Sequence, residues 1–272
     1  MIWGLLQKVF SVKQAKHKPL RIIYMGKDKP SVIEGLDWLM KQAVEIVAVV
    51  AVKDGTLSYF AKGNGLQVLT NKQLYKTKFK NIDLVISYLH PKRIKPKIIN
   101  LPKIGCLNFH PAPLPKYRGV ANYSRAILDE SPIFGVTAHF IDEEFDTGDL
   151  IRVWKFFIPE NSTAYSLEKI SMVWLLELFK CIMSMILADE PLPRRPQNHI
   201  IYNDIEPTYT SIKDLDVLRT VDLKKHSGED IERMVKAFWF PPFGGACIRV
   251  NGKEFTLVDK DILKQIKKWE SK

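Results

Sequence analysis

The run LRIIYMGKDKPSVIEGLDWLMKQAVEIVAVVAV, residues 20–52, predicts the architecture of the chain. Leu20–Tyr24 is short, apolar and β-branched, and it predicts a strand. Ser31–Ala43 has the spacing of a helix, and Glu45–Val52 predicts a second, fully buried strand. A strand, a helix and a strand in this order form the repeating unit of a parallel α/β sheet.

The same alternation continues downstream. Its elements suit a doubly wound, mostly parallel sheet, so the expected fold class is α/β and Rossmann-like. Further strands are expected at Leu84–Tyr88, Gly105–Phe109, Val136–Ile141 and Leu150–Phe157, and helices at Lys72–Tyr75, Asn122–Leu128 and Ser162–Leu187.

A domain boundary is expected after the last of these helices. Pro191, Pro193 and Pro196 stiffen the chain there, and residues 198–210 are typical of a connector. We therefore expect a basic N-terminal extension over 1–19, the α/β domain over 20–200 and a small α+β domain over 201–272.

The small C-terminal domain has two local signals. Ser227 with Asp230 predicts the start of a helix that runs to Phe238. The dipeptide Asn251-Gly252, between two β-like runs, predicts a two-residue hairpin turn.

Composition excludes several classes of protein. The 272 residues are 46% apolar and 26% charged, which rules out disordered, collagenous and low-complexity chains. The net charge of +11 favours polyanionic partners without choosing among phosphates, nucleic acid and acidic membranes. Cys106, Cys181 and Cys247 are too far apart in sequence for a disulfide framework or a paired-cysteine zinc site, and a reducing cytoplasm fits.

No stretch is expected to cross a bilayer. The most apolar window, Met172–Leu187, is interrupted by Glu177 and Lys180 and predicts a buried amphipathic helix. Residues 1–18 are basic but lack a cleavage site, so a docked extension or weak adsorption to anionic lipid is expected rather than a signal peptide.

The densest chemical signal is NFHPAPLPKYRG, Asn108 to Gly119. Residues two apart on a strand face one side, so Asn108 and His110 should point together into the crevice where open α/β sheets bind ligands. Downstream, Asp146-Thr147-Gly148 predicts a tight turn that aims the Asp146 carboxylate inward.

An amide, an imidazole and a carboxylate suit acyl transfer to an amine. Asn108 can donate to an oxyanion, His110 can relay a proton, and Asp146 can orient the imidazole. This chemistry needs neither a covalent nucleophile nor a metal. Spacing alone leaves a second interpretation open, in which His110 caps the loop and Asp146 only forms its turn.

The pattern Asn-x-His-Pro-x-x-Leu-Pro-x-Tyr-Arg-Gly, followed by Gly135-Val136-Thr137 and Asp146-x-Gly148, resembles the folate-dependent formyltransferase family. That family includes glycinamide ribonucleotide and methionyl-tRNA formyltransferases, and the resemblance covers most of residues 20–200. It implies transfer of a formyl group from N10-formyltetrahydrofolate to a primary amine, with Asn108, His110 and Asp146 in the catalytic positions.

The resemblance also implies a folate pocket made largely by the backbone of two segments, here 88–94 and 139–146. For each segment the alternative is an ordinary core strand and loop. The cofactor-binding residues implied are Tyr88, Leu89, Pro91, Lys92, Arg93, Ile94, His139, Ile141 and Asp142.

The tail suggests the acceptor. Only about seventy residues follow Pro196, fewer than a tRNA-gripping barrel is expected to need. The run FWFPPFGGA, residues 238–246, looks like the small domain of sugar N-formyltransferases, which act on nucleotide-linked amino sugars. We therefore expect a dTDP-, UDP- or GDP-linked deoxy amino sugar destined for a surface polysaccharide such as lipopolysaccharide O-antigen. The expected substrate-binding residues are Lys116, Tyr117, Arg118, Gly119, Asn122, Trp239, Phe240 and Phe243.

Several alternatives stay open. The aromatic residues of the tail can stack on the substrate or join the two domains, and Arg219 joins Lys116 and Arg118 as a candidate cation for the diphosphate. The lysine-rich stretch 72–97 is either a solvated face or a surface that attracts the folate glutamate tail or a sugar nucleotide. Two features depart from the family pattern: Ala112-Pro113 stands in place of Ser-Leu, and Asn122, a helix start or an acceptor ligand, replaces a proline.

Two other functions are weighed against this one. The first is a methionyl-tRNA formyltransferase with a shortened tail, which would bind tRNA in a salt-sensitive way. The second is a noncatalytic polyanion-binding module on the same fold. No nucleic-acid partner and no stable membrane insertion are expected, and a homodimer is left open.

Overall fold

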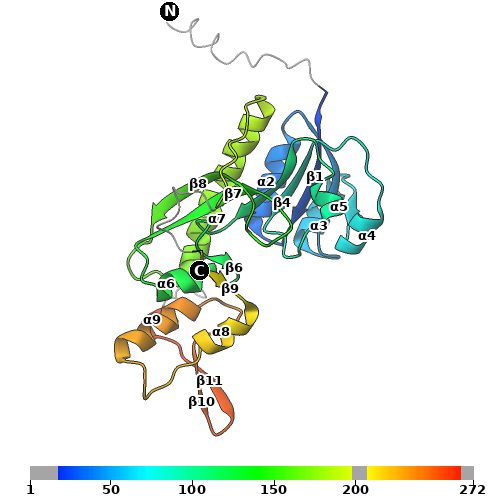
Figure 1. Cartoon of the computed structure of the whole chain (residues 1–272). Helices are drawn as coiled ribbons and strands as arrows, with labels where there is room; N and C mark the ends of the chain where they lie inside the picture. The colour runs from blue at the N-terminus through cyan, green and yellow to red at the C-terminus, as the bar shows by residue number, and fades with distance from the viewer. Residues whose placement is uncertain (1–17, 198–206, 265–272) are drawn as a thin grey trace, which may run out of the picture.

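The computed structural model describes residues 18–197 and 207–264 (Figure 1). Its main sheet is built from β1 (Leu20–Gly26), β2 (Val44–Val50), β3 (Val68–Leu69), β4 (Leu84–Tyr88), β5 (Gly105–His110), β7 (Ile133–Phe140) and β8 (Leu150–Phe157). They lie in the order β3-β2-β1-β4-β5-β7-β8. The strands from β3 to β5 are parallel, and β7 and β8 continue the sheet antiparallel. The expected doubly wound, mostly parallel sheet is confirmed.

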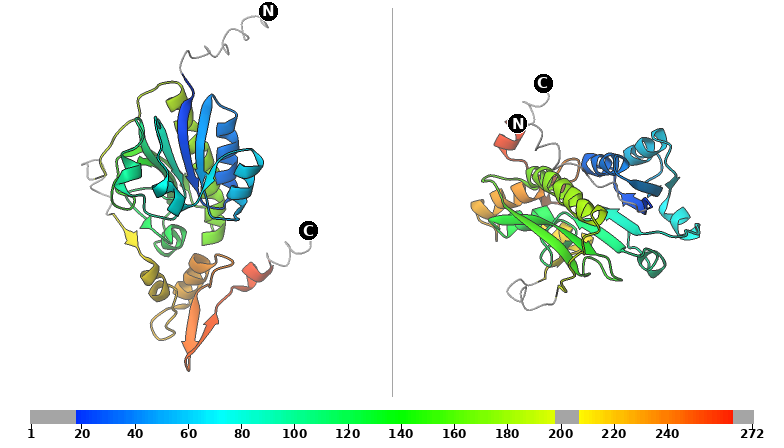
Figure 2. Two further views of the ribbon diagram at one scale, coloured as in Figure 1. Left: turned by 90° about the vertical axis from the view of Figure 1, so that its right-hand side faces the viewer. Right: turned by 90° about the horizontal axis from the view of Figure 1, so that it is seen from above.

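Helices cover both faces of this sheet (Figure 2). Alternation along β1 explains how: Ile22 and Tyr24 join one apolar cluster, and Ile23 and Met25 join another on the opposite face. The first cluster packs under α2, α3 and α7, and the second under α4 and α5. The helices of this domain are α2 (Pro30–Met40), α3 (Thr56–Gly63), α4 (Asn71–Lys76), α5 (Pro96–Ile99), α6 (Asn122–Leu128) and α7 (Ala164–Leu187).

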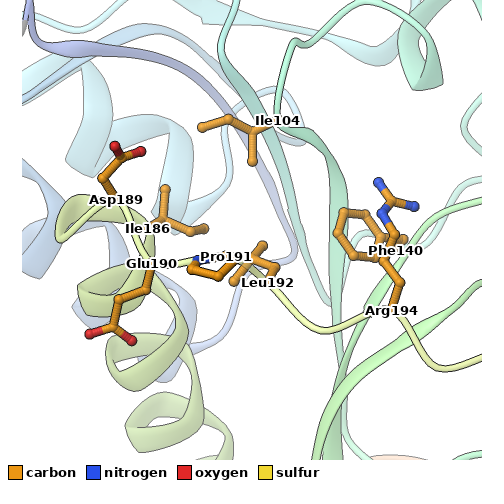
Figure 3. Close-up of a pocket in the computed structure, with 8 residues that line it drawn as sticks. All are labelled: Ile104, Phe140, Ile186, Asp189, Glu190, Pro191, Leu192 and Arg194. Atoms are coloured by element: carbon orange, nitrogen blue, oxygen red, sulfur yellow. The ribbon is translucent and has the colours of Figure 1, made fainter.

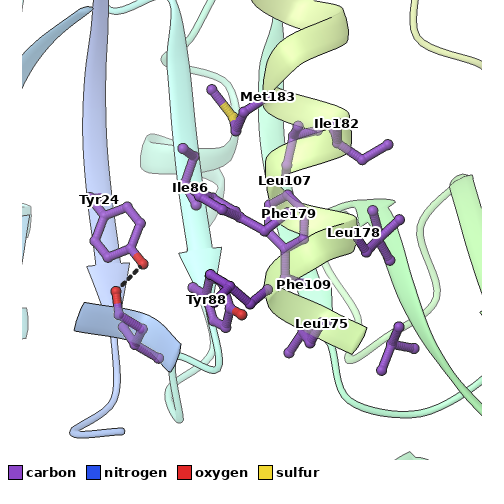
Figure 4. Packing of buried hydrophobic residues seen from close by; sticks show 14 of the residues in the cluster. Tyr24, Ile86, Tyr88, Leu107, Phe109, Leu175, Leu178, Phe179, Ile182 and Met183 are labelled. Atoms are coloured by element: carbon purple, nitrogen blue, oxygen red, sulfur yellow. Dashed lines mark hydrogen bonds between the residues drawn. The ribbon is translucent and has the colours of Figure 1, made fainter. Parts of the chain in front are cut away.

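The core lies under α7 (Figure 4), where Phe179 contacts four aromatic side chains, Tyr24, Trp38, Tyr88 and Phe109. Its ring centroid lies 4.9 Å from that of Phe109, 5.2 Å from Tyr88 and 6.3 Å from Tyr24. The Tyr24 hydroxyl donates to the Val32 carbonyl at 2.6 Å, which ties β1 to α2. This packing holds β1, β4 and β5 in fixed positions, and with them the groups at their carboxyl ends.

Helix α7 is long and apolar enough to cross a membrane, and among the described residues it is the one helix that meets this criterion. It is nevertheless a core helix here, because Leu175, Leu178 and Ile182 are fully buried. Glu177 and Lys180, 2.7 Å apart, lie on its outer side. The sequence expectation of a buried amphipathic helix agrees with this placement.

The C-terminal part comprises β9 (Tyr209–Thr210), α8 (Ile212–Leu218), α9 (Gly228–Phe238), β10 (Cys247–Val250) and β11 (Lys253–Thr256). It has its own apolar cluster around Met234, Val235 and Phe238, against which Ile127 and Leu128 of α6 pack. Strand β9 pairs in parallel with the short β6 (Arg118–Gly119) of the large domain. The β6–β9 pair and the packing of α6 on this cluster join the two parts, and further contacts come from α7, where the backbone N–H of Tyr165 donates to the Trp239 carbonyl at 3.1 Å.

The two local signals of this part are confirmed. Ser227 is the N-cap of α9 and accepts from the backbone N–H of Asp230 at 3.1 Å. Asn251 and Gly252 both have positive φ, 49° and 75°, as a tight hairpin turn between β10 and β11 requires.

Some elements were missed from sequence. Helix α8 begins two residues after the predicted connector and is seven residues long; Leu215 and Leu218, three positions apart, pack against the C-terminal cluster. Helices α3 and α5 and the two-residue strands β3, β6 and β9 are short. The N-terminal extension and the expected boundary at residue 200 lie outside the described residues, apart from residues 18 and 19.

Candidate active site

Three predicted catalytic side chains meet at the carboxyl end of β5. His110 Nδ1 lies 3.4 Å from Asp146 Oδ1, and both side chains are largely buried. Asp146 has φ 58°, the tight turn expected, and a Cβ at Gly148 would lie 2.1 Å from the Phe140 carbonyl oxygen. Only glycine fits there, so Gly148 lets the turn close and aims Asp146 inward.

The loop after β5 completes the surroundings of His110. His110 Nε2 lies 3.2 Å from the carbonyl oxygen of Tyr117 and 3.5 Å from the carboxamide of Asn122. The Asn122 amide has one orientation that satisfies its neighbours. In that orientation its nitrogen donates to the carbonyl oxygens of Tyr117 (3.0 Å) and Gly119 (3.3 Å), and its oxygen faces His110. Both ring nitrogens of His110 thus face oxygen acceptors, an arrangement that the doubly protonated imidazolium satisfies.

Asp146 is held as a carboxylate. Burial by itself would raise its pKa, but His110, His139, the backbone N–H of Gly119 and Arg118 together outweigh burial and lower the pKa. The Gly119 N–H donates to Asp146 Oδ2 at 3.1 Å. The β6 segment therefore holds the carboxylate in place.

A second histidine joins the site, and its side-chain contact was missed from sequence. His139 was expected to contribute through a folate-binding segment, yet its Nε2 lies 3.0 Å from Asn108 Nδ2 and 3.8 Å from Asp146 Oδ1. The contact follows from the antiparallel register of β5 and β7, which pairs Asn108 with His139. That register is a tertiary property, and no spacing in the sequence signalled it.

The two expected folate segments lie side by side. Arg93, which follows β4, donates to the carbonyl oxygen of Glu143 and pairs with the Glu144 carboxylate at 3.0 Å. Ile94 and Ile141 belong to one apolar cluster, which can border a flat ring. His90 Nδ1 is buried without a partner among the described residues, so this loop has a polar atom that a bound molecule can satisfy. These features fit a folate.

The other expected folate residues divide by exposure. Pro91, Lys92 and Asp142 are exposed, and Leu89 is half-buried with φ 57°. Tyr88 is fully buried and its ring stacks on Phe109, so its side chain belongs to the core. Only the Tyr88 backbone is left to contribute to a pocket.

The expected acceptor residues of the Pro-rich loop are largely engaged with the protein. Tyr117 is buried against Phe134, so it contributes its carbonyl rather than its ring. Lys116 Nζ lies 3.5 Å from Asp129 Oδ2, and Arg118 donates to Gln197 Oε1 at 2.6 Å. A ligand diphosphate would have to compete with these contacts.

The aromatic loop of the C-terminal part reaches this site. Phe240 stacks on Tyr123, with centroids 6.1 Å apart, and Tyr123 follows Asn122 on α6. Lys29 Nζ lies 5.9 Å from the Phe240 centroid and 2.7 Å from Glu168 Oε1. Lys29 and Glu168 were missed from sequence because the β1–α2 loop and α7 meet this aromatic loop only in the folded chain.

The remaining candidates for acceptor binding, Trp239, Phe243 and Arg219, differ in how far their side chains are engaged within the protein. Trp239 is half-buried against the C-terminal cluster, whereas Phe243 is 68% exposed and free to touch a ligand. Arg219 faces Asp216 and Glu254, with Nη2–O distances of 3.0 Å and 2.9 Å, within the C-terminal part. Its side chain is therefore committed to an internal network, and we withdraw it as a cation for the diphosphate.

Two cavities lie outside the catalytic cluster. One, of about 250 Å³, is lined by Ile104, Phe140 and Arg194 and by the chain that follows α7 (Figure 3). It lies beside the start of β5, whereas the catalytic groups lie at its end. The other, of about 460 Å³, lies between Arg125, β9 and α8.

Comparisons with known proteins identify the family. The family model described as Formyl transferase matches residues 37–171, which include the whole catalytic cluster. Methionyl-tRNA formyltransferase of Agathobacter rectalis is 30% identical over 257 residues, which cover 87% of this chain and 78% of that protein. The chain belongs to the formyl transferase family. The expected resemblance is confirmed.

Other relatives of this formyl transferase differ in their acceptors. GDP-perosamine N-formyltransferase of Brucella melitensis is 26% identical over 184 residues, 68% of this chain and 67% of that protein. The crystal structure of the sugar 3N-formyltransferase WlaRD, in the presence of dTDP and 5-N-formyl-THF, is 26% identical with a TM-score of 0.70 and covers 88% of this chain and 85% of its own. Methionyl-tRNA formyltransferase of Acetivibrio thermocellus, 27% identical, matches 66% of this chain and 63% of that protein.

Proposed function

We propose that this formyl transferase moves a formyl group from N10-formyltetrahydrofolate to the amine of a nucleotide-linked deoxy amino sugar. One observation carries the proposal: the buried cluster of Asn108, His110 and Asp146 lies next to Asn122 and Tyr123, on which the aromatic loop of the small domain packs. Groups suited to amine acylation and aromatic side chains suited to a nucleotide thus lie next to each other.

The donor assignment rests on the two adjoining segments 88–94 and 139–146, with their apolar border and the unpartnered His90 Nδ1. The folate ligand of WlaRD supports the same class of donor. The backbone of these segments would hold the folate, which supplies the formyl group.

The chain's residues supply the remaining chemistry. An N–H of Asn108 donates to the formyl oxygen as that oxygen gains negative charge. His110, whose two nitrogens face oxygen acceptors, acts as a cation beside the same oxygen. The amine nitrogen forms a bond to the formyl carbon as the bond from that carbon to N10 breaks. Asp146 stabilises the His110 cation and organises transfer of the proton lost by the amine to N10 of the leaving tetrahydrofolate.

The acceptor assignment rests on the side chains that surround Asn122 beyond His110. Phe240 and Tyr123 offer aromatic surface, and Lys29, 5.9 Å from the Phe240 centroid, would have to exchange its ion pair with Glu168 for a phosphate. Aromatic side chains stack on nucleobases and sugars, and a lysine can pair with a phosphate. The acceptors named for WlaRD and the Brucella enzyme support a sugar amine, and a cytoplasmic step in surface-polysaccharide synthesis fits such a product.

One observation favours a second candidate. Methionyl-tRNA formyltransferases match this chain over most of its length, with 30% identity for the Agathobacter rectalis protein. The net charge of +11 also suits a nucleic-acid acceptor. This candidate requires tight tRNA binding that weakens steeply with salt.

The test is an absorbance assay for consumption of N10-formyltetrahydrofolate. Wild-type protein is offered dTDP-, UDP- and GDP-linked 3-amino and 4-amino sugars, with initiator methionyl-tRNA in parallel. Turnover with one sugar nucleotide is the expected result. Turnover with tRNA alone would replace the acceptor, and binding of polyanions with no turnover on any amine would favour the noncatalytic module.

A further inference from the structure

A chain of four groups crosses three neighbouring strands beneath the catalytic cluster. Ser87 Oγ on β4 donates to Asn108 Oδ1 on β5 at 2.9 Å. Asn108 Nδ2 lies 3.0 Å from His139 Nε2 on β7, and His139 Nδ1 lies 2.7 Å from the carbonyl oxygen of Phe140. This chain of hydrogen bonds ends at the backbone carbonyl of Phe140, which can only accept.

That end sets the direction of every hydrogen bond in the chain. Because the Phe140 carbonyl accepts, the proton of the neutral His139 ring sits on Nδ1, and Nε2 carries a lone pair. Nε2 must then accept, so the group of Asn108 that faces it is the amide nitrogen. Ser87 donates to the amide oxygen at the other side.

Burial favours this neutral state. Ser87 and His139 are 3% and 2% exposed. Burial lowers the pKa of His139 to about 4, against the opposing attraction of Asp146 and with help from His110. The charged or titratable groups that face the His139 ring are Asp146, 3.8 Å away, Asp142 and His110, whose ring centroid is 6.4 Å distant. At neutral pH His139 is therefore an acceptor toward Asn108.

We propose that Ser87 and His139 are positioning residues that hold the Asn108 amide in one orientation. This proposal rests on the proposed function, in which Asn108 donates to the oxygen of the transferred group. In this orientation one Nδ2 proton is bound by His139 and the other is kept for that oxygen. A half-turn of the amide would present its oxygen to the developing negative charge and place that oxygen against the Nε2 lone pair of His139, so the hydrogen bond to His139 would be lost.

The first test needs no substrate. Long-range proton–nitrogen NMR of ¹⁵N-labelled wild-type protein reports which imidazole nitrogen of His139 carries the proton. The expected result is a protonated Nδ1 and an unprotonated Nε2 from pH 8 down to pH 5. A protonated Nε2 at neutral pH would overturn the proposal whether or not the protein transfers formyl groups.

The second test uses variants in the formyl-transfer assay. His139→Leu removes the acceptor and is expected to lower kcat about 10- to 100-fold, with KM for donor and acceptor changed less than about twofold. His139→Gln, whose side-chain oxygen can replace Nε2, is expected to recover most of the rate. Ser87→Ala tests the other end of the chain and is expected to lower kcat in the same way.

A matched control is His226→Gln. His226 Nδ1 accepts from the backbone N–H of Asp222 in the C-terminal part, so this histidine has a structural hydrogen bond outside the catalytic cluster. It is expected to leave kcat unchanged. Wild-type kcat in both His139→Leu and Ser87→Ala would overturn the positioning role, and a loss confined to KM would do the same. If wild-type protein transfers no formyl group, the proposed function fails, and the NMR result alone then decides the arrangement of the hydrogen bonds.

Discussion

Two clusters of four polar side chains lie in different parts of the molecule. One is the proposed catalytic cluster, Asn108, His110 and Asp146, together with His139, and the other is the hairpin network, Asp216, Arg219, Arg249 and Glu254. The hairpin network has the shorter ion pairs, 2.7 Å for Arg249–Asp216 against 3.4 Å for His110–Asp146. It lies in water, however, where such pairs contribute little. The proposed catalytic cluster thus differs from the hairpin network in its burial rather than in the closeness of its charges.

The largest effect expected is on turnover. Asp146→Asn removes the carboxylate that stabilises the His110 cation while keeping nearly the same shape. We expect kcat to fall about 100- to 10,000-fold, the range for loss of general acid–base assistance. Steady-state rates with the accepted sugar nucleotide measure this, with circular dichroism to show that the fold is intact. A rate near that of the wild type would remove Asp146 from the mechanism.

The second effect is on stability in acid. Burial lowers the pKa of His139 to about 4, whereas a histidine in the unfolded chain has a pKa of about 6.5. Between these two pH values the unfolded chain therefore binds a proton at His139 that the folded chain does not. The stability that the neutral ring contributes is fully present above pH 6.5 and is lost across that window, on the order of 3 kcal/mol in total.

Urea unfolding at a series of pH values measures this loss. His90, whose pKa is also lowered to about 4, contributes in the same window, so the informative quantity is the difference between wild type and His139→Gln. The unfolding free energy of His139→Gln should fall less steeply than that of the wild type as the pH is lowered from about 6.5 to 4. By contrast, Asp216 and Glu254 of the hairpin network have pKa values below their usual ones, and their contribution is lost only at lower pH. An equal decline of the unfolding free energy with falling pH in wild type and His139→Gln would contradict a lowered pKa for His139.

A smaller effect is expected at the aromatic loop. Phe240→Ala removes a ring that stacks on Tyr123 beside the catalytic cluster. If the ring also stacks on the acceptor, KM for the sugar nucleotide should rise about 3- to 10-fold, with kcat and the KM for the folate nearly unchanged. Phe157→Ala is the control, because Phe157 is 79% exposed on β8. An unchanged KM with a lowered melting temperature would restrict Phe240 to joining the two domains.

The smallest effect is expected in the hairpin network. Glu254→Gln removes one charge that faces Arg219 and Arg249 at the surface. The melting temperature should shift slightly at low salt and not at all at high salt, since salt screens exposed pairs. Turnover should be unchanged under both conditions. A large loss of turnover would show that this network communicates with the catalytic cluster.

Much of the large domain could be predicted from its sequence. Strands β4 and β8 and helix α6 begin and end at the residues predicted. Strands β6 and β9 escaped prediction because they are two residues each, too short for any periodic pattern. Their existence depends on pairing with distant partners.

The same division holds within the catalytic cluster. Asn108 and His110 share one strand face, and the Asp-x-Gly turn is local, so all three predicted groups follow from short-range geometry. The side chain of His139 is brought next to Asn108 by the register of β5 against β7. Beside the cluster, Lys29 and Glu168 meet because the β1–α2 loop packs on α7. These contacts depend on segments far apart in the chain.

The sequence by itself predicted the α/β class and the proximity of Asn108, His110 and Asp146, because strand alternation and turn residues act over a few positions. Only the tertiary structure decided which way the Asn108 amide points and how the small domain meets the site. A hydrogen bond has a direction only when both partners are in place, and here those partners are Ser87 on β4 and His139 on β7.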